Sequence, residues 1–421
     1  MIPLIKGVRD IFPPDSELWG HIKKEAENLF RDFGFSEILI PIMEKTELFK
    51  RGIGEQTDIV EKEMYTFADR NGESATLRPE ATASIARSYI SHKMYADDPI
   101  RKFYTIGPMF RRERPQKGRY RQFYQIDAEI FGQSSPYADA QLIIMLKTLM
   151  DRLKVKDTTL HINSLGCVKC RPAFNDSFKN FLIKISDNLC RNCQTRANTN
   201  PLRTLDCKNK SCSDFTKKAP KISDFLCEEC KEHFATVCEA LKDTNIDFQI
   251  NNRLVRGLDY YTKTAFEIQT DALGAQNAIA GGGRYDGLVK LLGGPDMPAV
   301  GFAIGFDRLA EIIALNNVSY TQKPEIFIAA LGKQCIKEAF LWMSALNAVG
   351  IKTETEFSEK SLKSLMRRAG KIGALNVIII GERELEKKEA LFRDMNTKKQ
   401  IEIKLDNPVK NIIEILSKKA V

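Results

Sequence analysis

Cysteines are unevenly distributed along this chain of 421 residues, because nine of the ten lie between Cys167 and Cys238. CxxC pairs in an intracellular chain are typical of tetrahedral zinc sites rather than of disulfides. Read in order along the chain, the spacings predict two structural sites of four thiolates each. The first would contain Cys167, Cys170, Cys190 and Cys193, and the second Cys207, Cys212, Cys227 and Cys230. Ordinary buried cysteines are the alternative.

Length and composition limit the possible classes of protein. The chain is too long for one ordinary core, so we expect two or three domains. Apolar residues make up 43%, more than a disordered chain contains. The longest apolar runs are too short to cross a bilayer, and acids and prolines interrupt the N-terminal segment where a signal peptide would be apolar. We therefore expect a soluble, cytoplasmic protein. Its net charge of +9 favours a polyanionic partner.

Hydrophobic periodicity predicts the order of the elements. We expect a helix over 16–34, a strand over 36–42, two strands over 101–110 and 122–132, and helices over 137–153 and 306–315. From 325 onward, strands and helices alternate in a β-α-β-α-β pattern. The predicted domains are a core formed by 1–166 and 241–317, a cysteine-rich insertion over 167–240, a linker over 318–324 and a C-terminal domain over 325–421.

The loop RRERPQKGRYR, residues 111–121, carries five arginines and Lys117 but one acid, Glu113. Such a density of positive charge repels itself unless an anion binds. Guanidinium groups match phosphate oxygens in pairs, so a triphosphate or a nucleic acid is the expected ligand. A solvated hairpin tip is the alternative.

The strand after this loop has one polar face. Alternation places Phe123, Gln125, Asp127 and Glu129 on that face and apolar side chains on the other. Carboxylates are costly to bury without partners, so this face either meets water or lines a pocket for a polar ligand. An aromatic ring beside arginines suits a purine nucleotide.

Other motifs, taken alone, are weaker evidence of a functional site. TLRPEAT, residues 76–82, reads as a surface turn. In LVRGLDYY, strand alternation would place Tyr260 and Tyr261 on opposite faces. GGGRYDG, residues 281–287, lacks the lysine of a P-loop. His161 lies in a predicted strand and is expected to be a core residue with satisfied hydrogen bonds rather than a catalytic one.

Four segments together resemble those of class II histidyl-tRNA synthetases. They are FRRERPQKGRYRQFYQIDAE (110–129), LVRGLDYY (254–261), AGGGRYDGL (280–288) and AVGFAIGFDRL (299–309). The resemblance implies an α+β catalytic core, in which an antiparallel sheet is flanked by helices, and a C-terminal α/β anticodon-binding domain. It also implies a homodimer formed through residues 35–44. The family has a helical insertion that clamps the tRNA acceptor arm, but the cysteine pairs depart from its functional signature.

The resemblance also implies the substrates and the roles of single residues. The activity would join histidine to tRNA(His) with ATP and Mg²⁺. ATP would bind to Arg111, Glu113, Arg119, Phe123 and Arg308. Histidine would bind to Glu80, Thr82, Gln125, Glu129, Tyr260 and Tyr261. Arg111 and Arg256 would act in catalysis beside the α-phosphate, and Gln116 would meet the acceptor end of the tRNA.

Two other functions remain open at this point. A synthetase-like regulatory subunit of ATP phosphoribosyltransferase typically lacks the anticodon-binding domain and has an eroded arginine loop, whereas this chain has both features intact. A zinc-dependent nucleic-acid-binding protein would explain the cysteines and the charge but not the polar strand face.

Overall fold

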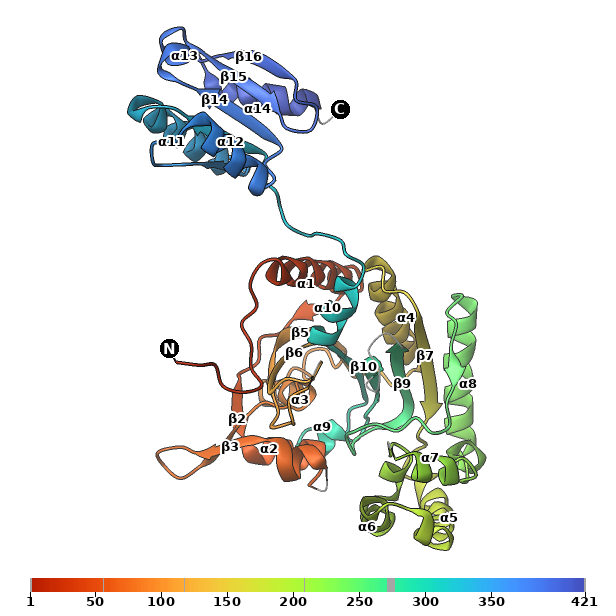
Figure 1. Cartoon of the computed structure of the whole chain (residues 1–421). Helices are drawn as coiled ribbons and strands as arrows, with labels where there is room; N and C mark the ends of the chain where they lie inside the picture. Colours follow the sequence, from red (N-terminus) through yellow and green to blue (C-terminus); the bar gives the residue numbers. More distant parts are fainter. Residues whose placement is uncertain (1, 56, 117, 208, 271–276, 420–421) are drawn as a thin grey trace. The chain divides into compact units, whose positions relative to one another are not determined.

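The computed structural model describes residues 2–55, 57–116, 118–207, 209–270 and 277–419 (Figure 1). The chain divides into two compact units, Met1–Ser319 and Tyr320–Val421. None of the helices in the described part of the chain combines the length and the hydrophobicity that crossing a membrane requires.

An eight-stranded sheet forms the centre of the first unit. Its order is β1 (Ser36–Glu37), β5 (Arg101–Phe110), β6 (Gln122–Phe131), β11 (Ala299–Gly305), β10 (Ala278–Arg284), β9 (Thr262–Thr270), β7 (Thr158–Ser164) and β8 (Gln249–Ile250). The six inner strands are antiparallel, and the two edge strands, β1 and β8, pair in parallel with their neighbours. The predicted antiparallel sheet is therefore confirmed for its centre, while the whole sheet is mixed.

Helices flank this sheet, as predicted. α1 (Asp15–Asp32) packs against α4 (Pro136–Arg152) and α10 (Phe306–Ala314) along one side of the sheet (Figure 1). α1 buries the side chains that its periodicity places on one face, and Trp19 from this helix packs on Phe306 with ring centroids 4.2 Å apart. The predicted helices over 16–34, 137–153 and 306–315 thus match these elements to within about two residues at each end.

A smaller sheet and its helices contribute the other side of the core. The sheet has the order β2 (Met43–Lys45), β4 (Ser74–Leu77) and β3 (Tyr65–Ala68). The helices are α2 (Thr46–Ile53), a π-helix (Ile59–Glu63), α3 (Thr82–Ser91) and α9 (Leu288–Leu291). α3 packs against both α2 and α9. Its first residue, Thr82, donates a hydrogen bond to Glu129 of β6, so this end of the helix lies next to the large sheet.

The strand predicted over 36–42 is wrong for most of its length. Only Ser36 and Glu37 pair with β5, and one further backbone bond joins Ile38 to Tyr104. The chain then leaves the edge of the sheet, because Pro41 has no N–H to donate and Leu39 points outward with 81% of its surface exposed.

The cysteine-rich segment folds into short helices that follow β7. They are α5 (Arg171–Lys184), α6 (Arg191–Thr199) and α7 (Lys210–Thr216), and the longer α8 (Glu228–Asp243) returns the chain to the sheet. α8 packs on α4 (Figure 1). At that contact the buried carboxylate of Asp139 accepts hydrogen bonds from Nε2 of His233, at 2.8 Å, and from Nε of Arg284, at 3.0 Å. Burial opposes ionisation of Asp139, but these two partners outweigh it and lower its pKa.

The second unit is an α/β domain, as predicted. Its sheet has the order β13 (Thr353–Thr355), β12 (Ile326–Ala330), β14 (Asn376–Ile380), β15 (Glu389–Asp394) and β16 (Gln400–Lys404). The helices are α11 (Lys333–Ala348), α12 (Leu362–Lys371), α13 (Glu382–Glu386) and α14 (Pro408–Lys419). β13, β12 and β14 are parallel, which fits the predicted β-α-β-α-β pattern, whereas β15 and β16 form an antiparallel extension that the sequence analysis did not include.

Candidate active site

A cavity of about 240 Å³ lies over the centre of the large sheet. Most of the residues predicted from the sequence line it together. They are Glu80, Thr82, Arg111, Glu113, Arg119, Phe123, Gln125, Arg256, Tyr260, Tyr261 and Arg308. Two predicted residues are placed differently. Glu129 is buried beneath the cavity, and Gln116 is exposed at the tip of the hairpin between β5 and β6. Lys117, in the same loop, lies outside the described residues.

Three buried carboxylates form the acidic floor of this cavity: Glu80, Asp127 and Glu129. Glu80 is 3% exposed and accepts hydrogen bonds from the backbone N–H groups of Thr82, at 2.8 Å, and Ala83, at 2.9 Å. It therefore holds the N-terminus of α3, where the helix dipole favours negative charge. The interpretation of TLRPEAT as a surface turn is wrong, because this segment is anchored inside the core.

Burial strongly perturbs the other two acids of the floor. Glu129 is 1% exposed, and burial raises its pKa to about 8, although hydrogen bonds from the hydroxyls of Thr82, at 2.6 Å, and Tyr285 oppose the shift. Burial and the neighbouring charges of Glu129 and Glu80 hold the pKa of Asp127 well above its usual range. Within the described residues, Oδ2 of Asp127 and Oε1 of Gln125 accept no hydrogen bond. The floor thus has acceptor groups available to a cationic ligand.

Glycines in β10 and β11 make room for two of these side chains. A Cβ atom added at Gly301 would lie 1.4 Å from Oε2 of Glu129, and one added at Gly281 would lie 2.4 Å from Nη1 of Arg256. Any larger residue would displace the charged group that it meets. Each of the two glycine motifs therefore contributes a glycine that shapes the site.

Four arginines form the basic wall of the cavity: Arg111, Arg119, Arg256 and Arg308. The guanidinium of Arg111 lies over the ring of Phe123, 5.2 Å from its centroid, and its Nε donates to the carbonyl of Pro79 at 2.9 Å. Arg119 is paired with Glu113 at 3.0 Å. These bonds fix the direction in which the guanidinium groups point, so that the wall is preformed for an anion.

Arg256 connects the wall with the loop that precedes β9. Its Nη1 donates to Oε2 of Glu267 at 2.6 Å, and its guanidinium lies 5.7 Å from the ring centroid of Tyr261. Tyr260 and Tyr261 both line the cavity, with ring centroids 4.7 Å apart. The prediction that their hydroxyls lie on opposite faces is wrong, because residues 251–261 form turns rather than a strand and do not alternate.

Two residues of the site were missed. Tyr285 donates to Glu129, and Glu267 pairs with Arg256. Tyr285 lies inside the motif AGGGRYDGL, so the sequence did contain a signal for it. Glu267 was detectable as the acid between the apolar neighbours Phe266 and Ile268 in β9, but its partner comes from another segment.

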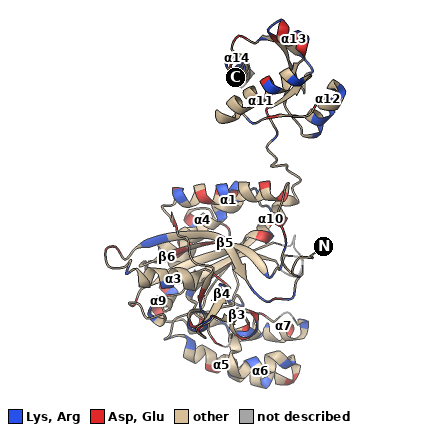
Figure 2. Ribbon diagram, turned by 90° about the vertical axis from the view of Figure 1, so that its left-hand side faces the viewer, with Lys and Arg blue, Asp and Glu red and all other residues tan. Residues whose placement is uncertain are grey.

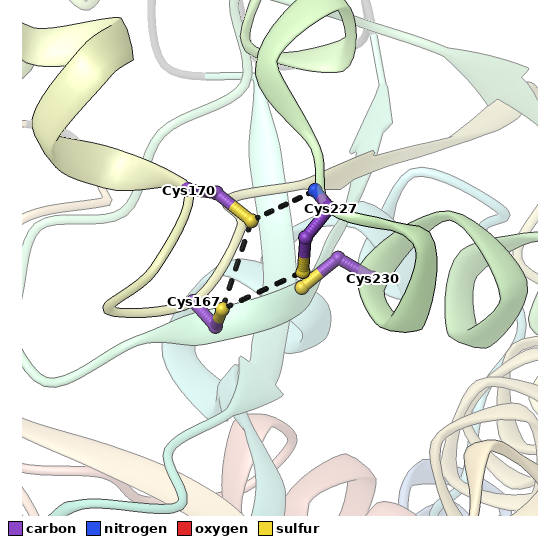
Figure 3. Close-up of side chains that lie close together, drawn as sticks. All are labelled: Cys167, Cys170, Cys227 and Cys230. Atoms are coloured by element: carbon purple, nitrogen blue, oxygen red, sulfur yellow. Dashed lines mark hydrogen bonds between the residues drawn. The ribbon is translucent and has the colours of Figure 1, made fainter.

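The eight cysteines of the predicted zinc sites gather in two clusters, but not in the predicted groups. Cys167 and Cys170 meet Cys227 and Cys230 (Figure 3), and Cys190 and Cys193 meet Cys207 and Cys212. The second cluster is thus nested within the first along the chain. The sequential grouping is wrong because α5 carries the chain away from Cys170, and α8 returns it with Cys227 at its start.

The geometry of both clusters fits a tetrahedral ion. In each cluster all four sulfur atoms lie within 4.8 Å of one another, and contacts of 3.6 Å and 3.9 Å join Cys167 to Cys170 and Cys227. Four thiolates about 2.3 Å from a zinc ion would be about 3.8 Å apart. The thiols of this cluster differ in acidity. Burial opposes ionisation of Cys170, but backbone hydrogen bonds at Cys167 and Cys227 outweigh it and lower its pKa to about 7, whereas burial raises the pKa of Cys230. The donors, four cysteines per cluster, are those of structural zinc sites.

Comparisons with known proteins cover nearly the whole chain. A family model described as histidyl-tRNA synthetase matches residues 7–171 and 189–309, and one described as anticodon binding domain matches 325–415. A histidine–tRNA ligase of Desulforapulum autotrophicum is 56% identical over 418 residues, which cover 99% of this chain and 98% of the relative. One of Geobacter sulfurreducens is 50% identical over 405 residues, covering 96% and 98%.

Solved structures give the same picture of the fold. The apo histidyl-tRNA synthetase of S. aureus superposes with a TM-score of 0.82 at 34% identity, covering 97% of this chain and 99% of that one. A protein from Bacillus halodurans, described as ATP phosphoribosyltransferase regulatory subunit/histidyl-tRNA synthetase, reaches a TM-score of 0.66 at 19% identity, covering 90% and 98%. At that identity the second likeness is one of fold alone.

Proposed function

This chain belongs to the histidyl-tRNA synthetase family, and from that membership we propose that its cavity activates histidine with ATP and transfers it to tRNA(His). The observation that carries this assignment is the division of one cavity into an acidic floor and a basic wall. An amino acid with a cationic ammonium group and a nucleotide with polyanionic phosphates fit this division.

Histidine binds over the acidic floor. Glu80 and Glu129 accept hydrogen bonds from its ammonium group and from a ring N–H, and Thr82, Gln125, Tyr260 and Tyr261 complete the pocket. An amino acid without these donors would leave buried carboxylates unpaired, which is costly and gives the site its specificity. The raised pKa of Glu129 supports this assignment, because the residue lacks a cationic partner among the described residues.

ATP binds along the basic wall. Phe123 stacks on the adenine, Glu113 accepts from its amino group, Arg111 contacts the α-phosphate, and Arg119 and Arg308 contact the γ-phosphate. The carboxylate of Glu267 also lines the cavity and is an oxygen ligand of the kind that magnesium prefers. Mg²⁺, when bound with ATP, neutralises phosphate charge.

The first chemical step forms histidyl-adenylate. A carboxylate oxygen of histidine attacks the α-phosphorus, and the bond to the bridging oxygen of pyrophosphate breaks. Arg111 and Arg256 stabilise the charge that develops on the equatorial oxygens without transferring a proton. In the second step the terminal ribose hydroxyl of the tRNA attacks the carbonyl carbon of the adenylate, and AMP leaves.

The tRNA meets both units of the chain. Gln116, exposed at the hairpin tip, contacts the acceptor end, and the second unit binds the anticodon stem. Residues 324–421 contain 18 basic and 13 acidic side chains, a net charge of +5. α12 carries basic residues, drawn blue in Figure 2. The exposed ones are Lys363, Arg367, Arg368 and Lys371. Such a row suits binding to phosphates.

The chain acts as a homodimer in the cytoplasm. Support for a dimer comes from the segment 35–44, where Leu39, Ile42 and Met43 are exposed apolar side chains close together in sequence. Each of the two cysteine clusters holds one zinc ion, and the support is the sulfur geometry together with the four-thiolate donor set.

ATP–pyrophosphate exchange, measured with each of the twenty amino acids, tests the proposal. Exchange with histidine alone, followed by charging of tRNA(His), is the expected result. Exchange with another amino acid would contradict the assignment of the pocket. Folded protein that exchanges with none would favour the regulatory subunit.

A further inference from the structure

The two cysteine clusters are each connected to the loop that carries the histidine-binding tyrosines. This loop, residues 251–261, joins β8 to β9 and contains Arg256, Tyr260 and Tyr261. It has no regular secondary structure, so its shape depends on what it contacts. We call Cys167, Cys170, Cys227 and Cys230 the inner cluster, and Cys190, Cys193, Cys207 and Cys212 the outer cluster.

Arg171 connects the inner cluster to the end of the loop. It follows Cys170 directly, and its guanidinium donates to the carbonyl of Leu165, at 3.1 Å, and to that of Tyr261. The same region is joined to the start of β9, because Gly166 accepts from the N–H of Lys263 at 2.9 Å. The position of Tyr261 therefore depends on the turn that presents Cys167 and Cys170.

Arg253 connects the outer cluster to the start of the loop. It comes from the loop itself, and its guanidinium donates to the carbonyls of Leu205 and Ser213 and to the hydroxyls of Ser213 and Thr216, at 3.1 to 3.4 Å. Ser213 and Thr216 belong to α7, the helix of Cys212. These acceptors of the Arg253 guanidinium all lie in the segment that surrounds Cys207 and Cys212.

Further contacts run from the outer-cluster segment to the middle of the loop. Asn200 donates to Oδ1 of Asp259 at 3.1 Å, and Arg203 donates to the carbonyl of Arg256 at 3.5 Å. The backbone of Arg256 is thus held from the cysteine-rich side, while its side chain reaches Glu267 in the sheet.

The segment that provides these contacts has a small core that is rich in cysteines. α6 has nine residues and α7 has seven, both too short to be stable alone. Four of the buried residues in their core are cysteines, namely Cys170, Cys193, Cys212 and Cys230. Small modules of this kind generally need a metal or disulfides to hold their fold, and all ten cysteines are free thiols.

We propose that zinc bound at the two clusters fixes the 251–261 loop through Arg171 and Arg253, so that metal occupancy controls the formation of the histidine site. This inference rests on the proposed function, because it concerns the same pocket. Arg171 and Arg253 are positioning residues, since neither lines the cavity over the sheet. Loss of the metal frees α6 and α7, and the loop then loses the acceptors of Arg253 while the eight-stranded sheet stays folded.

The test compares zinc-loaded and chelator-treated full-length protein by hydrogen exchange and by histidine binding. We expect faster exchange in 251–261 after metal removal, with β5 and β6 unchanged, and restoration on adding zinc. Unchanged exchange in the loop, or a preparation that takes up no metal, would overturn the proposal. A failure of the proposed function is distinct, because the zinc-loaded protein would then show no ATP–pyrophosphate exchange.

A variant that keeps all the cysteines isolates the connection itself. Arg253→Met should retain the metal and show faster amide hydrogen exchange in residues 251–261. It should also raise the KM for histidine about tenfold, because several hydrogen bonds of a charged group are lost. Arg253→Lys should recover part of this effect. Lys179→Met, which removes an exposed charge from α5 in the same segment, is the matched control and should behave like the parent. Equal KM values for Arg253→Met and Lys179→Met would contradict the proposal.

Discussion

The carboxylate of Glu129 occupies the space that a side chain at position 301 would fill. The two residues lie opposite each other on the neighbouring strands β6 and β11, and a Cβ at Gly301 would come within 1.4 Å of Oε2 of Glu129. The acid of one strand and the glycine of the next are thus one structural unit, which places a buried carboxylate under the cavity.

Gly301→Ala should therefore impair the histidine site. The added methyl group displaces the carboxyl group of Glu129 from Tyr285 and Thr82. Because a buried polar group that loses its hydrogen bonds costs about 1–3 kcal/mol, we expect the KM for histidine to rise about tenfold. Steady-state kinetics of ATP–pyrophosphate exchange measure this KM. Gly287→Ala is the control, because a Cβ there meets nothing within 4 Å. If the two variants had the same KM, Glu129 would have no role in binding histidine.

Arg256→Ala should abolish adenylate formation and leave the fold intact. A half-buried guanidinium aimed at developing phosphate charge contributes about 3–4 kcal/mol, or a factor of 10²–10³ in kcat. The rate of ATP–pyrophosphate exchange measures adenylate formation, and the circular dichroism spectrum tests the fold.

The substitution also leaves Glu267 without its ion-pair partner, so Arg256→Ala combined with Glu267→Gln is the control for that half-buried charge. Near-normal exchange in either variant would refute the catalytic role. Recovery of exchange in the double variant would mean that the unpaired acid, and not the missing guanidinium, caused the loss.

The raised pKa of Glu129 makes stability depend on pH. Between the ordinary carboxyl value of 4.5 and about 8, the folded chain holds a proton that the unfolded chain has released. The free energy of unfolding should therefore fall as the pH rises through this window. Glu129→Gln should reduce that fall by about 1–3 kcal/mol, since one pKa unit corresponds to about 1.4 kcal/mol.

Chemical denaturation at pH 5 and pH 8 measures the effect. Glu47→Gln, at an exposed glutamate of α2, is the control and should keep the pH dependence of the parent. A Glu129→Gln protein with the same pH dependence as the parent would show that this acid is already ionised in the folded chain.

Two fourfold cysteine variants distinguish the nested grouping from the sequential one. Serine at positions 167, 170, 227 and 230 destroys one nested site and should leave one metal ion per chain. Serine at 167, 170, 190 and 193 damages both nested sites and should leave none. Elemental analysis of purified protein gives the counts. The sequential grouping predicts the opposite results, with no metal ion in the first variant and one in the second. The parent should contain two equivalents, and less than about half an equivalent would exclude structural zinc.

The basic side chains of α12 should contribute to tRNA affinity without affecting adenylation. Reversal of two charges, in Lys363→Glu with Arg367→Glu, should weaken tRNA(His) binding about tenfold or more and lower the salt dependence of binding by about two ions. Filter binding at several salt concentrations measures both. Lys337→Glu, exposed on α11, is the single-charge control. The rate of ATP–pyrophosphate exchange without tRNA should be unchanged in all variants. A lower rate would mean that α12 also affects adenylation.

The sequence alone determined the local elements and most of the residues around the cavity. The arginine loop, the alternating polar face of β6 and the glycine motifs were readable because strand periodicity and the chemistry of single residue types are local properties. For the same reason the β-α-β-α-β pattern was recognised, whereas β15 and β16, which lack such a strong signal, were not included.

Only the tertiary structure decided which distant residues meet. Spacing grouped the cysteines in sequence order, but α8 returns Cys227 and Cys230 to Cys167 and Cys170, and the remaining four pair among themselves. The same holds for Gly301 with Glu129, which strand register places opposite each other, and for Glu267 in β9 with Arg256, which comes from the loop before that strand. Periodicity specifies the face on which a side chain lies, but contacts between distant segments depend on how the chain folds back, and no local pattern contains that information.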